Sequence, residues 1–202
     1  MALEVRIVQG NPQEVPPKDF EEIADLLNQH WGSFFVTNPH QVITRMASGD
    51  LFFVGYEEGK VTSVFETLTI RSDSPRIPED GVYPYLTGNG TWNTWYSHGK
   101  YEILVFVDVA ANGKGNGKAT LNYAIGYLAR KTRFEHFLTN TPDISMVQEF
   151  HISMGAELTQ FRVPYARLGY RPGDKELRPN DRPEDVVSLS YSKKVREMRA
   201  SL

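Results

Sequence analysis

The apolar residues of the first fifty positions follow the period of a strand and then the period of helices. Leu3 to Val8 is a short strand candidate. Asn38-Pro39 is typical of an N-cap followed by a first-turn proline, and Gly49 stands where a C-terminal cap is expected. We therefore predict a strand, an amphipathic helix and a second helix at 39–48. The first helix is indicated by apolar residues at helical spacing, namely Phe20, Ile23, Ala24, Leu27 and Trp31.

Residues 51–71 have the pattern of a β-hairpin. Leu51 to Tyr56 and Val61 to Arg71 are two apolar stretches. They flank Glu57-Glu58-Gly59-Lys60, which offers a glycine for a tight turn. We predict that the first two core strands pair here.

The second half of the chain alternates between strand-like and helix-like segments. Ile103 to Val109 is rich in β-branched residues and predicts a strand, and a helical pattern follows a glycine-rich segment. We predict an aromatic-rich loop at 72–101 and a charged, proline-rich insertion at 164–185, before the last strand. The tail, 193–202, is predicted to be a solvated helix or a frayed end. The remaining expected elements are a strand at Phe134–Thr139, a helix at Ile144–Met154 ending at Gly155, and strands at Glu157–Val163 and Val186–Tyr191.

Composition narrows the class of protein. With 202 residues and 40% hydrophobic content, the chain is long enough for one substantial core, so we expect a single domain over 1–202. The 22 basic and 25 acidic side chains give a net charge of -3, which argues against a nucleic-acid partner. There is no long apolar run and no leader-like N-terminus, so we expect a soluble, cytoplasmic protein without a membrane partner. A homodimer is left open.

The most informative segment is Asn112 to Lys118, with three glycines and two lysines between a strand and a helix. Backbone N–H groups exposed at the start of a helix suit a pyrophosphate. A dinucleotide fingerprint would need glycine at 118 or 120, where the chain has Lys118 and Thr120, and a Walker loop would need Ser or Thr in place of Ala119. A plain hairpin turn is the competing interpretation, because Asn-Gly occurs twice.

Val107 to Ala119 resembles the acetyl-CoA signature of the GNAT superfamily, a strand ending in Arg/Gln-x-x-Gly-x-Gly/Ala. The order of elements over about residues 3–163 is also similar to that superfamily. The resemblance implies a GNAT fold of the α/β (α+β) class, with a mixed, mostly antiparallel twisted sheet of about seven strands and about four helices. One position departs, because Asn112 stands where the family has Arg or Gln. The implied acetyl-CoA-binding residues are Val107, Val109, Asn112, Gly113, Lys114, Gly115, Asn116, Gly117 and Lys118.

The resemblance implies an N-acetyltransferase in which a primary amine, from a small-molecule acceptor, attacks the thioester of acetyl-CoA directly. Such a reaction agrees with the absence of cysteine, and we expect no metal. A carboxylate on the signature strand is the family's usual general base, and Glu102 and Asp108 share parity on that strand. Glu66 and His98 are alternatives. Each candidate also has an interpretation without a catalytic role, and for Glu66 it is that of a solvent-facing strand residue.

His151 occupies the position of the family's tyrosine, which commonly protonates the departing CoA thiolate. Val147, Phe150, His151 and Met154 share one helix face, so the imidazole should point toward the sheet. A pKa near neutrality would let the residue donate a proton. The alternative is a core histidine whose polar atoms are satisfied.

The aromatic loop is expected to line the acceptor groove, where it would bind an apolar amine or stack on a cation. The residues in question are Trp92, Trp95, Tyr96 and His98. A small core beneath a long loop is an equally good interpretation. Two other functions stay open: a GNAT fold that binds CoA but has lost catalysis, and an interaction domain in which the glycine segment is only a turn.

Overall fold

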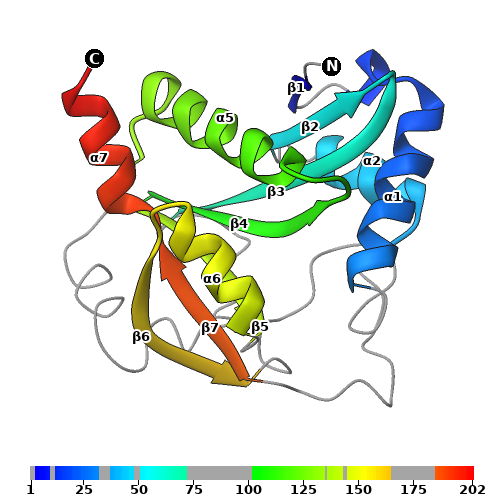
Figure 1. Ribbon diagram of the computed structural model, residues 1–202. Helices are drawn as coiled ribbons and strands as arrows, with labels where there is room; N and C mark the ends of the chain where they lie inside the picture. The colour runs from blue at the N-terminus through cyan, green and yellow to red at the C-terminus, as the bar shows by residue number, and fades with distance from the viewer. Residues whose placement is uncertain are drawn as a thin grey trace. The chain divides into compact units, whose positions relative to one another are not determined.

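The computed structural model describes residues 3–9, 12–31, 37–47, 51–71, 102–134, 136–142, 145–164 and 185–202 (Figure 1). Contacts group these residues into two compact units. The first contains the described residues up to 68 together with 106–127, and the second contains 69–71, 102–105 and the described residues from 128 onward. The single domain stays a prediction.

The strands of the first unit are ordered β1-β2-β3-β4. They span Glu4–Gln9, Leu51–Glu57, Lys60–Arg71 and Glu102–Ala111. β2 pairs antiparallel with both β1 and β3. The β2–β3 turn has two residues, Glu58 and Gly59, at φ 53° and 74°. Positive φ at both positions is the signature of the hairpin turns that match strand twist, so the predicted hairpin is confirmed.

The helices of the first unit begin with a 3-10 turn at Pro12–Glu14 and continue as α1, Pro17–Trp31, and α2, Pro39–Ala47. α2 starts with a reciprocal cap. The Gln41 backbone N–H donates to Asn38 Oδ1 at 2.9 Å, and the Asn38 backbone N–H donates to Gln41 Oε1 at 2.8 Å. Both predicted helices are therefore confirmed, while Gly49 lies outside the described residues.

β2 is buried on both faces, which explains its almost continuous apolar sequence. Phe52 and Val54 join the core made with α1 and α2. On the other face, Phe53 meets Tyr127 of α5 edge to face, with ring centroids 5.8 Å apart. Gly55 is needed on that face, because a Cβ there would lie 2.2 Å from Ser63 Oγ.

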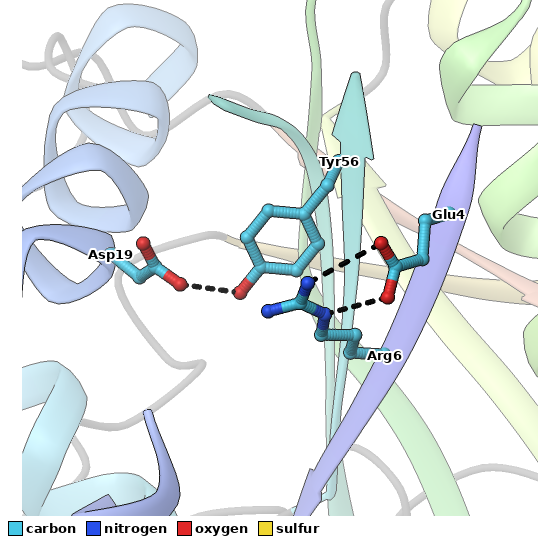
Figure 2. Close-up of polar contacts among 4 residues, drawn as sticks. All are labelled: Glu4, Arg6, Asp19 and Tyr56. Carbon is cyan, nitrogen blue, oxygen red and sulfur yellow. Dashed lines mark hydrogen bonds and ion pairs between the residues drawn. The ribbon is translucent and has the colours of Figure 1, made fainter. Parts of the chain in front are cut away.

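A polar cluster fixes α1 to β2 (Figure 2). The hydroxyl of Tyr56 donates to the buried carboxylate of Asp19 at 2.8 Å. Arg6 lies 4.5 Å from the centroid of the Tyr56 ring and pairs with Glu4 at 2.8 Å. Burial and the bond to Asp19 raise the pKa of Tyr56, so its hydroxyl stays a hydrogen-bond donor throughout the physiological range.

The second unit is built on the antiparallel strand order β5-β7-β6. These strands span His136–Pro142, Asp185–Ser190 and Glu157–Pro164. α6, Ser145–Ser153, ends as predicted at Gly155, which has φ 91°. The N–H groups of Gly155 and Ala156 donate to the carbonyls of Ile152 and His151, which is the Schellman arrangement that satisfies a helix C-terminus.

The C-terminal tail is a helix, which is one of the two predicted alternatives, and it is not a frayed end. It forms α7, Ser192–Ala200, in which Val195 is fully buried. The Arg199 guanidinium donates to the carbonyls of Ala129, Thr132 and Phe134 at 2.6–3.0 Å. Three charge-assisted bonds at the C-terminus of α5 give the tail a structural anchor, because that helix end carries unpaired carbonyls.

The described residues thus form the predicted α+β architecture, with seven strands and antiparallel pairing in both units. They contain five α-helices, α1, α2, α5, α6 and α7, where about four were expected. None of these helices combines the length and apolar character needed to cross a membrane.

Candidate functional site

The glycine segment connects β4 to α5, Asn116–Lys131, through the short turn 112–115 (Figure 1). This confirms the strand, glycine loop and helix predicted from the sequence, and the hairpin alternative is wrong. The first helical bond runs from the Ala119 N–H to the Gly115 carbonyl at 2.9 Å, so Gly115 is the N-cap. The N–H groups of residues 115–118 therefore have no acceptor within the helix, and the helix dipole favours an anion beside them.

The three glycines of this segment have different roles. Gly113 and Gly115 have φ of 83° and 93°, whereas Gly117 is buried in the first turn of α5. A Cβ on Gly113 would lie 2.8 Å from Asn116 Nδ2, so this glycine is required by the loop itself. A Cβ on Gly115 would meet no atom within 4 Å. Gly115 is thus the glycine that leaves open space next to the unpaired N–H groups.

Asn112 ties the loop to the C-terminal turn of α1. Its Nδ2 donates to Gln29 Oε1 at 2.8 Å, and its Oδ1 lies 3.1 Å from His30 Nε2. Its backbone N–H donates to the Thr62 carbonyl at 2.7 Å. Both polar atoms of the amide are therefore engaged with α1. No local pattern indicated Gln29 or His30 as neighbours of the loop, because they lie more than 80 residues away along the chain.

Asn116 closes the loop from the helix side. Its Nδ2 donates to the Asn112 carbonyl at 3.0 Å and to Glu57 Oε2 at 3.2 Å. Glu57, the last residue of β2, is a third neighbour that the sequence did not reveal. Lys114 and Lys118 are exposed, as a role at the rim of an anion site requires. The structure thus brings Asn112, Gly113, Asn116 and Glu57 together around one turn.

The other predicted binding and base residues are less fully described. Glu102, Val107, Asp108 and Val109 lie on β4, but of these the structure describes only the side chain of Val109, which is half-buried. The predicted acceptor residues lie outside the described residues; they are Trp92, Trp95, Tyr96 and His98. Their roles stay predictions.

Glu66 is not the solvent-facing strand residue considered above. Its side chain is fully buried, and Oε2 lies 3.2 Å from Nε of Arg45 on α2. Both side chains of this ion pair are buried, so neither carboxylate oxygen of Glu66 lies at the surface. Glu66 therefore belongs to the packing of α2 on the sheet.

His151 lies on α6 and is 3% exposed, as its position on the inward face of the helix predicted. Its Nδ1 lies 2.6 Å from Tyr191 Oη, and its ring meets those of Phe150 and Tyr191 edge to face. Burial lowers the pKa of His151 to about 4. The condition for proton donation by His151, a pKa near neutrality, is therefore not met in this buried position. The imidazole is neutral at pH 7, which agrees with the core interpretation.

We expect the burial of His151 to make the protein less stable in acid. The unfolded chain takes up a proton below the ordinary pKa of 6.5, whereas the folded chain resists it until about 4. The contribution is thus complete above pH 6.5 and is lost as the pH falls to about 4, by about 3 kcal/mol in total. Denaturant unfolding at a series of pH values should show a shallower acid dependence in His151→Phe than in the unchanged protein.

Tyr191→Phe provides the matched control, because it removes the hydrogen bond and keeps the ring that buries His151. The pKa of His151 is lowered by desolvation, so this variant should retain the acid dependence of stability. Parallel pH curves for the unchanged protein and His151→Phe would contradict the assignment.

Comparisons with known proteins support the fold. No protein-family model matches the sequence, and no curated protein matches it either. Solved structures do match. NAA60 of Arabidopsis thaliana in complex with acetyl-CoA aligns with a TM-score of 0.59 and 9% identity, over 94% of this chain and 98% of that chain. The polyamine N-acetyltransferase of Drosophila melanogaster aligns with a TM-score of 0.59 and 14% identity, over 93% of this chain and 99% of that chain.

A third match is the loading GNATL domain of CurA from Lyngbya majuscula, with a TM-score of 0.61 and 16% identity, over 98% of this chain and all of that domain. This chain has the GNAT fold. The fold covers nearly the whole chain, so it includes both the glycine turn at the start of α5 and His151 on α6. The resemblance seen in the signature segment is thus confirmed as a likeness of fold.

Proposed function

We propose that this GNAT-fold chain is an N-acetyltransferase that moves an acetyl group from acetyl-CoA to a primary amine of a small-molecule acceptor. The observation that carries the proposal is the start of α5, where unpaired N–H groups adjoin the open space at Gly115. That arrangement fits the diphosphate of CoA. Neighbours of the same fold include one solved with acetyl-CoA and one that forms N-acetylagmatine.

In this proposal the backbone of residues 115–118 binds the diphosphate, and the exposed Lys114 and Lys118 add positive charge at the rim. Asn112 contributes by holding the turn against α1 through Gln29 and His30 rather than by its own charge. This is the consequence of having a short amide where the family has a long side chain. Val107, Val109, Gly113 and Asn116 complete the donor site.

The amine attacks the thioester carbonyl, a C–N bond forms and the C–S bond breaks. CoA leaves as a thiolate, which takes the proton that the attacking nitrogen loses and becomes the thiol. A lysine-like amine has a pKa near 10.4, and exposing its lone pair at pH 7 takes about 4–5 kcal/mol. We propose Asp108 or Glu102 of β4 as the base that accepts this proton. His151 stays a candidate for a place near the sulfur, but with a pKa of about 4 it does not act as a cationic acid at neutral pH.

The acceptor would bind against the aromatic segment that contains Trp92, Trp95, Tyr96 and His98. We further propose a cytoplasmic location, no nucleic-acid or membrane partner, and no metal requirement. Among the described residues, no three His, Asp or Glu side chains gather as a metal site would require. A homodimer stays open.

A second function is favoured by two specific observations: Asn112 is engaged with α1, and His151 is buried and neutral. Both agree with a CoA-binding module that has lost catalysis. Two measurements on the purified protein separate the alternatives. Calorimetry with CoA reports binding, and release of thiol from acetyl-CoA in the presence of agmatine, an arylalkylamine or a peptide amine reports transfer.

Amine-dependent thiol release would establish the transferase. CoA binding without thiol release from any amine would favour the inactive module. Absence of CoA binding would reject both and leave the glycine segment as a turn.

A further inference from the structure

A carboxylate from β2 lies beside the turn that we assign to the donor diphosphate. Oε2 of Glu57 accepts a hydrogen bond from Nδ2 of Asn116, the first residue of α5, at 3.2 Å. The same oxygen would lie 3.9 Å from a Cβ built on Gly113. The protein thus supplies its own anion next to the helix N-terminus where a diphosphate would bind.

The position of this carboxylate is fixed by the strand that carries it. Tyr56, the preceding residue, is held by Asp19 and by Arg6 (Figure 2). Glu57 itself is the last residue of β2 to pair with β3, opposite Lys60. Its side chain is half-buried, so its charge is less screened than that of a fully exposed carboxylate.

The two states of the loop place opposite demands on this charge. In the free protein, an anion close to the start of α5 is favourable because it lies at the positive end of the helix dipole. When a diphosphate occupies the same helix end, the carboxylate is a like charge that contacts the first residue of that helix. The residue should therefore stabilise the empty loop and oppose the charged donor.

We propose that the Glu57 carboxylate lowers the affinity of the donor site for CoA, because it repels the diphosphate that binds at the same helix end. The inference rests on the proposed function, and it deepens it by assigning a residue that tunes donor affinity and favours release of CoA. It predicts that Glu57 affects only donors that carry phosphate. A thioester of pantetheine, which lacks the diphosphate, is not opposed by this charge.

The test uses Glu57→Gln, which removes the charge and keeps an oxygen to accept the bond from Asn116. Glu58→Gln is the matched control, because Glu58 is the next residue, is exposed and makes the same change in net charge. CoA binding is measured by calorimetry at low and high salt, and the melting temperature of each free protein is measured alongside.

Glu57→Gln should bind CoA about three- to tenfold more tightly at low salt, and the gain should shrink at high salt. Its free form should melt slightly earlier, because the helix end loses its anion. Glu58→Gln should change neither quantity. Tighter binding by a less stable protein is a combination that structural damage does not produce.

Unchanged or weaker CoA binding by Glu57→Gln, while the unchanged protein binds CoA, would overturn this inference and leave the proposed function standing. An equal gain in Glu58→Gln would also overturn it, because net charge would then be the cause. An equal gain for acetyl-pantetheine would do the same. Failure of every variant to bind CoA would reject the proposed function, and the inference with it.

Discussion

Replacing Gly115 by glutamate is expected to abolish CoA binding, by at least about a hundredfold, and to leave the protein folded. The new side chain would enter the open space beside the N-terminus of α5, where no atom lies within 4 Å of its Cβ. It would fill the space proposed for the diphosphate and repel it with a carboxylate. Calorimetry with CoA measures the loss, and a melting curve checks the fold.

Gly59→Glu controls for backbone strain. Gly59 has φ 74°, close to the 93° of Gly115, and a Cβ there also meets no atom within 4 Å. Each substitution should lower the free energy of unfolding by roughly 1 kcal/mol, because a side chain is forced into a left-handed conformation. Only the change at 115 should affect CoA. Full CoA binding by folded Gly115→Glu would remove the turn from the donor site.

Replacing Arg45 by methionine is expected to lower the free energy of unfolding by about 3–5 kcal/mol. Arg45 is 3% exposed and its ion-pair partner, Glu66, is fully buried. The substitution removes the guanidinium and leaves the Glu66 carboxylate in the packed layer between α2 and the sheet. Denaturant unfolding, with the slope compared between variants, gives the change directly.

The double variant Arg45→Met with Glu66→Leu is expected to recover most of the loss, because the buried charge is removed together with its partner. Lys193→Met is the matched control. It breaks the pair with Glu157, in which both side chains are more than half exposed, and stability should change little. A small effect of Arg45→Met alone would show that the buried pair is not needed for the fold.

The sequence by itself determined most of the elements around the glycine turn. Apolar spacing and the Asn38 cap predicted α1 and α2, and the turn at Glu58-Gly59 predicted the hairpin. Glycines at 113 and 115 predicted that β4 would turn sharply into α5. These signals are local, since each depends on residues close together in the sequence. They can therefore be recognised without knowledge of the tertiary structure.

Only the tertiary structure decided which side chains are buried, paired or free to act. Arg199 became an anchor for α5 instead of part of a solvated tail, because its carbonyl partners lie 65–70 residues earlier. Glu66 is one partner of a buried ion pair, and burial lowers the pKa of His151 to about 4. Glu57 reached the loop through Asn116, 59 residues away. Desolvation and charge pairing depend on distances in space between residues that are far apart in the sequence. A local sequence pattern does not predict those distances.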